Sequence, residues 1–520
     1  MRFAWIILLG LLAGFTSLST GAANYDLIVR NARIIDGTGN PAYHGDLAVK
    51  EGKIAALGRV DGTASQELDS HGLVVCPGFI DVHTHAEDIL ERPRAENFAR
   101  MGVTTLVLGN CGSSMLHLGD FFKKLEATNI SVNVASLIGH GTVREKAMRG
   151  NFDRPPTPDE MKEMKSLVRQ AMQDGAVGLS TGLIYLPGTF AKTDEIIELA
   201  KVASIYGGIY TSHMRDEGKE IFQSLDEVFR IAREARIRVE ISHIKLSGKP
   251  SWGHARKVLD AIERARAEGL DITQDQYVYT ASSTGISQLV PEEFREGGKF
   301  KEHLAAEKPR IIAAMREKLK KAGRKDYSYA VIADYKADRN LNGLSIAEAA
   351  RKKRGSSSLS NQIELVLEIQ SHGGASGVFH GMSEDDLRVF LAHPNTMIAS
   401  DSGVREFEAG IPHPRGYGNN ARLLERYVGE IKLLRLEDAI RKMTSLPAST
   451  FRLKGRGELK EGNAADLVMF DPAKVREETT FKNPHHYATG FNYVLVNGKV
   501  VIEADKHTGD YPGRVLRPSN

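Results

Sequence analysis

The sequence is poor in cysteine and carries no excess of charge of either sign. Only two cysteines occur among its 520 residues, so at most one disulfide bond can form within the chain. The 69 Lys and Arg residues nearly balance the 66 Asp and Glu residues, which leaves a formal net charge of +3. This balance gives no indication of nucleic acid as a partner and favours small-molecule chemistry. With 41% hydrophobic residues, the chain can bury one large core and a smaller second one.

The apolar run that opens the chain is too short to span a membrane. It extends from Phe3 to Phe15 behind Met1-Arg2, whereas a transmembrane helix needs about 20 residues. The small residues at 20–23 suit a signal peptidase, so we predict that residues 1–23 are a signal peptide. The protein would then be exported, most simply to a bacterial periplasm, and have no membrane partner after cleavage. No cysteine lies in this N-terminal region, so a lipid anchor is not expected there. The alternative to cleavage is that the apolar run is retained as an N-terminal anchor.

Both ends of the chain have the pattern of β-strands. In residues 24–75, apolar clusters such as Leu47-Ala48-Val49 alternate with turn residues such as Glu51-Gly52-Lys53. The pattern returns in residues 448–520, where Asn497-Gly498 is a strong hairpin signal. Neither segment is long enough to form a stable sheet alone. We therefore predict one small β-sandwich domain made from both ends, with a larger domain inserted between them.

The middle of the chain, residues 76–447, alternates short apolar strands with amphipathic helices such as residues 157–174. Eight strands are expected, one that begins at residue 78 and others near residues 103–108, 131–138, 176–180, 208–211, 238–242, 272–274 and 396–400. This repeat is typical of an α/β fold, the (β/α)8 TIM-like barrel. Between the last two strands, residues 291–355 are charged and helix-rich, and too long for an ordinary loop. We predict a helical insertion over the barrel mouth, either a lid or a surface helix pair without a role.

Metal-competent side chains occur where these strands end. The first strand leads into His83-Thr84-His85, and residues i and i+2 of a strand share one face. The other such residues are Cys111 after the second strand, His213 and His243 at the ends of the fifth and sixth, and Asp401 at the end of the eighth. The carboxyl ends of barrel strands converge on one rim, so these six side chains predict a metal site there.

A disulfide bond between the two cysteines is not expected. Cys76 precedes the first strand and Cys111 follows the second, so neighbouring parallel strands would place the two thiols at opposite ends of the barrel. At about 3.3 Å per residue that separation is roughly 20 Å, whereas a disulfide needs Cα atoms within about 7 Å. Cys76 is therefore predicted to be a free core residue.

The mature chain resembles the amidohydrolase superfamily, and within it the D-aminoacylase (N-acyl-D-amino-acid deacylase) family. The resemblance covers most of the 520 residues. The segments that carry it, in chain order, are Gly78–His85, Gly102–Thr105, Gly109–Gly112, Ile138–Thr142, Gly178–Leu183, Ser212–Arg215, Ser242–Lys245, His413–Arg415 and Pro512–Arg517.

The resemblance implies a zinc hydrolase that releases free D-amino acids from N-acyl-D-amino acids or D-configured peptides. It implies a tight zinc site made by Cys111, His213 and His243, a ligand set that leaves one position open. His83, His85 and Asp401 would form a second, weaker site, and the number of bound metals stays open. Zinc would polarise the amide carbonyl and acidify a water molecule. Asp401 would take the proton from this water and deliver it to the leaving nitrogen.

The substrate carboxylate would be bound by Arg415, Lys245, Tyr277 and Ser283, and Tyr185 would line the pocket, again by resemblance. The sequence departs from the family at Tyr277-Val278-Tyr279, where Tyr-Pro-Tyr is usual, and after Asp401, where Arg405 offers a second anion contact. A cyclic-amide hydrolase of the dihydroorotase or hydantoinase type is the alternative, although those relatives usually supply a lysine in place of Cys111. A non-enzymatic scaffold is a third hypothesis, which the complete ligand set disfavours.

Overall fold

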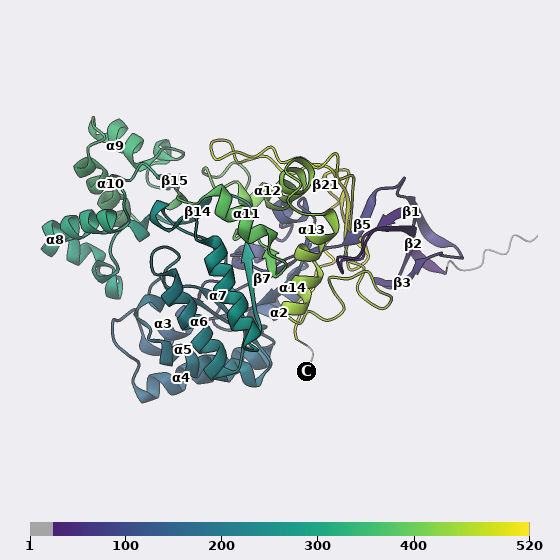
Figure 1. Ribbon diagram of the computed structural model, residues 1–520, viewed down its shortest axis with the longest axis horizontal. Coiled ribbons are helices and arrows are strands. Elements are labelled where there is room, and N and C mark those ends of the chain that lie inside the picture. The colour runs from purple at the N-terminus through teal and green to yellow at the C-terminus, as the bar shows by residue number, and fades with distance from the viewer. Residues whose placement is uncertain (1–23, 519–520) are drawn as a thin grey trace, which may run out of the picture.

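The computed structural model describes residues 24–518, and the predicted signal peptide lies outside these residues. Figure 1 shows three parts along the long axis of the molecule: a β domain at one end, a central barrel, and a helical segment with α8, α9 and α10 at the other end. Among residues 24–518, no helix has both the length and the apolar character needed to cross a membrane.

The central part is the predicted (β/α)8 barrel. Its parallel strands are β6 (Phe79–Asp81), β7 (Val103–Leu108), β8 (Asn133–Ser136) with its continuation β9 (Ile138–Gly139), β10 (Gly178–Gly182), β11 (Ile209–His213), β12 (Arg238–Ile241), β13 (Ile272–Gln276) and β17 (Thr396–Ile398). They pair in this order. The first and last strands meet where the backbone N–H of Asp401 donates to the carbonyl of His83 and that of His85 to Ser402. The ring is therefore closed, and nearly all strand residues are buried, as strands covered on both faces require.

Helices surround the barrel, and α4 and α11 among them begin at a side-chain cap. Helix α4, for example, follows Thr157, whose hydroxyl accepts from the backbone N–H of Glu160 while the Glu160 carboxylate accepts from the Thr157 N–H. The helices of the barrel are α1 (Glu96–Ala99), α2 (Leu118–Thr128), α3 (His140–Met148), α4 (Pro158–Asp174), α5 (Thr193–Ile205), α6 (Ile221–Ala235), α7 (Ala255–Ala267), α11 (Glu384–Ala392), α12 (Arg415–Arg422), α13 (Leu436–Met443) and α14 (Ser445–Thr450).

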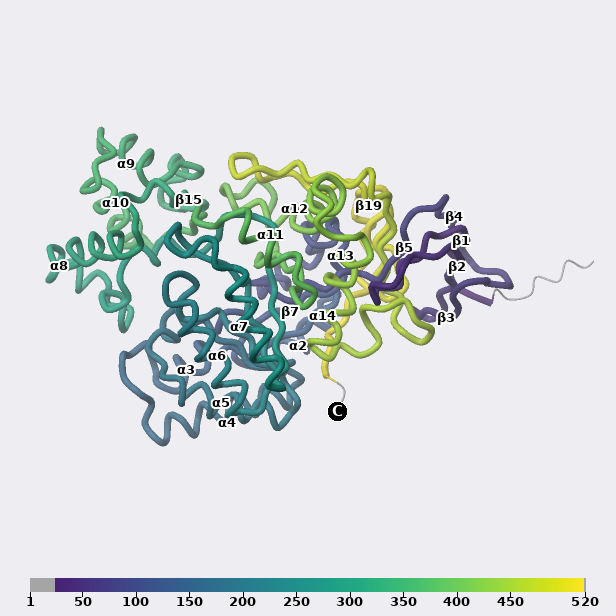
Figure 2. Tube along the Cα trace, viewed as in Figure 1, coloured from purple at the N-terminus to yellow at the C-terminus, as the bar shows by residue number. Residues whose placement is uncertain are grey.

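The β domain joins both ends of the chain in one nine-stranded sheet, as the purple and yellow segments in Figure 2 show. Its strands are β1 (Tyr25–Ile34), β2 (Tyr43–Lys50), β3 (Lys53–Gly58), β4 (Ala64–Asp69), β5 (Val74–Pro77), β18 (Leu467–Phe470), β19 (Phe491–Val496), β20 (Lys499–Glu503) and β21 (Lys506–His507). The sheet branches at β1, which pairs with β2, β4 and β5. The β2–β3 hairpin bends back onto the start of β18, where the Ile54 N–H donates to the Asn463 carbonyl at 2.8 Å.

The segment inserted between β13 and β17 is larger than the predicted residues 291–355. It contains β14 (Ala281–Gly285), α8 (Phe300–Lys321), β15 (Ala330–Asp334), α9 (Ile346–Arg354), α10 (Leu359–Ser371) and β16 (Ser376–His380). The three strands form a separate sheet, and the segment has its own apolar cluster. The sequence did not indicate β14 and β16 because Ala281-Ser282-Ser283-Thr284-Gly285 and Ser376-Gly377 lack the apolar alternation that marks a strand.

Candidate active site

The six predicted ligands lie together at the carboxyl-end rim of the barrel. His83 and His85 follow β6, Cys111 follows β7, His213 is the last residue of β11, His243 follows β12 and Asp401 follows β17. All of them are buried except His85, which is partly exposed. Five different strands thus contribute to one site, as expected where parallel strands end in a closed ring.

The thiol of Cys111 is at the centre of this group. Its Sγ lies 3.2 Å from Nε2 of His83, 3.6 Å from Nδ1 of His213 and 3.7 Å from Nε2 of His243. A tetrahedral zinc ion, with bonds of about 2.3 Å to sulfur and about 2.0 Å to nitrogen, holds such atoms roughly 3.5 Å apart. Nε2 of His213 is buried and has no hydrogen-bond partner among the described residues. The spacing and the donor set therefore fit a zinc ion.

The electrostatic surroundings favour the thiolate form of Cys111. Burial by itself raises the pKa of the thiol, but the charge of His83 and the contacts with His213 and His243 outweigh this effect. The pKa of Cys111 therefore lies well below its ordinary value. The thiolate is the form of cysteine that binds metals.

The donor atoms of these ligands lie in overlapping groups. Those that lie mutually close are the donor atoms of His83, Cys111 and His243, those of His83, His85 and Asp401, and those of His213, Glu217 and His243. Oδ1 of Asp401 is 3.3 Å from Nε2 of His85 and 3.7 Å from Nε2 of His83. His83 and His243 are therefore each shared between two groups, and Nδ1 of His213 also lies 3.6 Å from the thiol of Cys111.

Three of the site residues have backbone angles that side chains rarely adopt. Cys111, His243 and Asp401 have φ values of 54°, 37° and 51°, in the left-handed region. Each of them lies two or three residues beyond the end of a barrel strand, where the chain turns sharply at the rim. Such conformations cost about 1–3 kcal/mol each and cluster at functional sites.

Comparison with known proteins agrees with this geometry. The profile of the Amidohydrolase family matches residues 66–502. The chain belongs to this family.

Within the family, the similarity to D-aminoacylases extends over almost the whole chain. This amidohydrolase is 37% identical to D-aminoacylase of Alcaligenes xylosoxydans xylosoxydans, over 95% of this chain and 97% of that protein. A crystal structure of D-aminoacylase superposes with a TM-score of 0.82 at 34% identity, covering 95% of this chain and all of the other. The N-acyl-D-glutamate deacylase of Bordetella bronchiseptica, solved with zinc and a phosphonate inhibitor, has a TM-score of 0.82 at 32% identity, with 95% and 99% of the two chains covered. The resemblance to the D-aminoacylase family and the barrel fold are thereby confirmed.

The five predicted substrate-binding residues surround the ligands of the amidohydrolase. The Arg415 guanidinium lies 2.8 Å from Oδ2 of Asp401 and stacks 4.5 Å from the ring centre of Tyr277. Nζ of Lys245 donates to Oε1 of Glu217 at 2.6 Å. The ring of Tyr185 packs 4.9 Å from that of His213, and Ser283 lines the space in front of Asp401.

Two buried carboxylates that sequence reasoning missed orient the imidazoles. Asp275 of β13 lies 3.1 Å from Nδ1 of His83 through one oxygen and accepts a hydrogen bond from the backbone N–H of His243 at 2.9 Å through the other. Oε1 of Glu217 lies 2.9 Å from Nδ1 of His243. A carboxylate beside one ring nitrogen fixes the tautomer and directs the other nitrogen to a metal. Their signals in the sequence were an acid near the end of the seventh strand and an acid four residues after His213.

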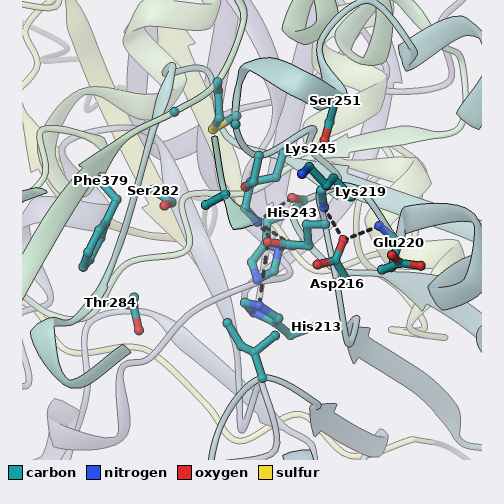
Figure 3. Close-up of a pocket in the computed structure, with 18 of the residues that line it drawn as sticks. His213, Asp216, Lys219, Glu220, His243, Lys245, Ser251, Ser282, Thr284 and Phe379 are labelled. Carbon is teal, nitrogen blue, oxygen red and sulfur yellow. Dashed lines mark hydrogen bonds and ion pairs between the residues drawn. The ribbon is translucent and has the colours of Figure 1, made fainter. Parts of the chain in front are cut away.

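Three cavities meet at Asp401 and Ser283. The first, which we call the basic cavity, has a volume of about 560 Å³ and runs from His213 and His243 to Lys219, Lys321 and Arg324. Figure 3 shows this cavity, with Asp216, Lys219 and Glu220 on one side of His243 and Phe379, Ser282 and Thr284 on the other. The second, the glycine-lined cavity, holds about 340 Å³ beside Cys111, Gly112, Gly141, Gly182 and Gly188. The third, about 390 Å³, is lined by Arg405 and Arg415.

Both cysteines are free, as predicted. Cys76 lies in β5 at the other end of the barrel strands from the site, and its thiol is buried in the core. No covalent partner therefore competes with a metal for Cys111.

Proposed function

We propose that this amidohydrolase uses zinc to cleave the amide bond of N-acyl-D-amino acids and releases the free D-amino acid. The observation that carries the proposal is a buried thiolate ringed by three imidazoles, beside an ionised Asp401 that is paired with Arg415. The similarity to D-aminoacylase and N-acyl-D-glutamate deacylase supports the substrate class and its handedness.

Cys111, His213 and His243 would hold one zinc ion tightly, and His83, His85 and Asp401 would offer a second, weaker position. When bound, zinc supplies Lewis acidity to the amide carbonyl and to water. Asp275 and Glu217 keep the imidazoles of His83 and His243 turned toward the metal position.

Asp401 is the candidate general base. Burial by itself raises the pKa of its carboxyl, but Arg415 and then His83 outweigh burial and hold this pKa well below its usual range. The carboxylate is therefore ionised at neutral pH and able to accept a proton from the attacking water. It would return this proton to the leaving nitrogen.

Arg415 is suited to the carboxylate of the substrate. Its side chain is buried, and its Nε and Nη1 have no hydrogen-bond acceptor among the described residues, although Nη1 is close to Asp401. Unmet donors of a planar guanidinium are a strong site for a carboxylate. Lys245, whose Nζ lies 5.9 Å from the ring centre of Tyr277, would contribute a second positive charge.

Export to the periplasm is a further part of the proposal and rests on the predicted signal peptide alone. It is tested by determining the N-terminus of the protein recovered from a periplasmic fraction, which we expect near Asn24.

The main test is amine release by the zinc-loaded protein from matched N-acetyl-D- and N-acetyl-L-amino acids, with a chelator-treated control. We expect release from the D series alone, and its loss with chelator. Release from the L series alone would overturn the proposed handedness. No release from either series, together with hydrolysis of D-dipeptides or cyclic amides, would overturn the proposed substrate class.

A further inference from the structure

The basic cavity is formed between the barrel and the inserted segment. The barrel contributes the loops after β11 and β12, and the insertion contributes β14, the end of α8 and the turn after it. The two sides are joined by hydrogen bonds, from Nζ of Lys219 to the Lys321 carbonyl at 2.6 Å and from the Gly248 N–H to the Gly381 carbonyl at 2.8 Å. The insertion therefore makes one wall of the space that opens onto the candidate active site.

Four cations that line the outer part of the basic cavity lack acidic partners. Among residues 24–518, Lys219, Lys318, Lys321 and Arg324 form no ion pair with a carboxylate. Lys219 and Lys318 donate only to main-chain carbonyls, those of Lys321 and Gln288. The two outer acids, Asp216 and Glu220, form no ion pair with these four cations, and the carboxylate of Asp216 accepts two backbone N–H groups instead.

Arg324 is held in a fixed position near the substrate-binding residues. Its guanidinium stacks on Tyr329, with Cζ 3.5 Å from the ring centre. Its other side lies against Gly381, where even a methyl group would come within 2.6 Å of Nη2. The next residue, Met382, accepts a hydrogen bond through its sulfur from the hydroxyl of Tyr277 at 3.4 Å. A stacked guanidinium keeps its edge free for a carboxylate.

The glycine-lined cavity on the other side of Asp401 has the opposite character. No lysine or arginine is among the described residues that line it, and its charged outer residue is Glu145. If the proposed function is correct, Lys245, which lines the basic cavity and not the glycine-lined one, draws the amino-acid part of the substrate toward the basic cavity, which leaves the glycine-lined cavity for the acyl group. The positive charge thus lies on the amine side of the scissile bond.

We infer that Arg324, with Lys321 beside it, forms a second anion subsite, separate from Arg415, that binds a carboxylate on the amine side of the substrate. The inference rests on the proposed function and narrows its substrate class. The carboxylate belongs either to an acidic side chain, as in N-acyl-D-glutamate, or to the C-terminus of an N-acyl dipeptide.

The test compares N-acetyl-D-glutamate with N-acetyl-D-glutamine, which has nearly the same shape and no side-chain charge. We expect the ratio of kcat/KM for the two to fall about tenfold in Arg324→Gln, mainly through KM, because a charge-assisted contact is lost. Arg324→Lys should restore part of the ratio. The matched control is Lys320→Gln, an exposed residue of α8 four positions before Arg324 that lines none of the three cavities. The inference would be overturned if Arg324→Gln and the double variant with Lys321→Gln left unchanged both this ratio and the corresponding ratio for the peptide pair described next.

A second set of substrates distinguishes an acidic side chain from a peptide C-terminus as the source of the carboxylate. It also separates a failure of the inference from a failure of the proposed function. N-acetyl-D-alanylglycine and its C-terminal amide are compared in the same variants. If Arg324→Gln changes the ratio of kcat/KM for this pair alone, the subsite binds the C-terminus of a peptide. Calorimetric binding of D-glutamate and D-glutamine to the zinc-loaded protein measures the subsite without turnover. A charge preference that depends on Arg324 but is accompanied by no hydrolysis would refute the proposed function alone, and hydrolysis without this preference would refute the inference alone.

Discussion

At the scale of single residues, the site is a chain of charges that offset one another in a buried space. The Cys111 thiolate faces three imidazoles, and Asp401 faces both His85 and Arg415. Each charge would be costly to bury alone, and its neighbours offset that cost. Removing one of these charged side chains therefore changes the protonation of its neighbour. Single substitutions then separate catalytic from structural roles only when the metal content of the variant is measured as well.

Asp401→Asn tests the role of the candidate base. Its amide cannot accept a proton, so we expect turnover to fall by roughly 10²- to 10⁴-fold. Zinc content should stay close to one equivalent, because Cys111, His213 and His243 are unchanged. Activity assays and metal analysis of the same preparation check this. Loss of zinc in parallel with activity would show that Asp401 is mainly a ligand.

The buried Lys442, which lies outside the candidate active site, should make the free energy of unfolding depend on pH. Its Nζ is buried on α13 and donates to the carbonyls of His393 and Thr396, and burial lowers its pKa from 10.5 to about 7. Between pH 7 and 10.5 the unfolded chain therefore binds more protons than the folded one, so the free energy of unfolding rises with pH, by up to about 1.4 kcal/mol per unit. Below pH 7 this contribution is flat.

We expect Lys442→Met to remove this slope, and the exposed Lys320→Met to retain it. Thermal unfolding of the three zinc-loaded proteins at pH 7, 8 and 9 measures the difference. Parallel curves for the wild type and Lys442→Met would contradict the prediction.

At the scale of elements, the strand ends depend on glycines that let neighbouring turns approach closely. Gly182, the last residue of β10, lies against the Cys111 main chain, and a Cβ at this position would overlap the Cys111 carbonyl and the ring of Tyr185. The Cys111 turn itself needs Gly109 and Gly112, which have φ values of 79° and 76°. The position of the thiol thus depends on the backbone of adjacent βα units.

Gly182→Ala should displace the Cys111 turn. We expect about 1–3 kcal/mol of destabilisation from the steric overlap and a clear loss of zinc affinity. Gly429→Ala is the control, because its added methyl group meets only ordinary contacts. Competition with a zinc chelator measures affinity, and chemical denaturation measures stability. Unaltered zinc affinity in Gly182→Ala would show that the turn tolerates the shift.

At the scale of the whole molecule, a metal at the rim would tie together five strands that are distant in the chain. His83, for instance, is 28 residues from Cys111 in the sequence and His243 is 132 residues from it, and both contact its thiol. A ligand that binds only the folded state stabilises it, by about 2.7 kcal/mol at a hundredfold excess over Kd. Stability and metal content are therefore linked.

We expect zinc to raise the melting temperature of the metal-free protein by a few degrees, and to raise that of Cys111→Ala much less. Calorimetry with and without zinc is the measurement, and magnesium, which prefers oxygen ligands, is the control. An equal shift in both proteins would place the stabilising metal elsewhere.

The sequence by itself determined the overall architecture and which metal-competent side chains lie at the carboxyl-end rim of the barrel. Strand periodicity predicted the parallel barrel, and the carboxyl ends of parallel strands must meet, so His83, His85, Cys111, His213, His243 and Asp401 were expected together before any contact was known. Hairpin signals at both ends likewise predicted one shared β domain.

Only the tertiary structure decided how these side chains divide and what surrounds them. The sharing of His83 between two groups, the supporting carboxylates Glu217 and Asp275, and the left-handed turns at Cys111 and His243 depend on side-chain directions across the ring. The insertion also extends beyond the predicted residues and turns Arg324 toward the active site. Local patterns do not encode such features, because they arise from contacts between separate segments of the chain, such as His83 and Asp275, which are 192 residues apart.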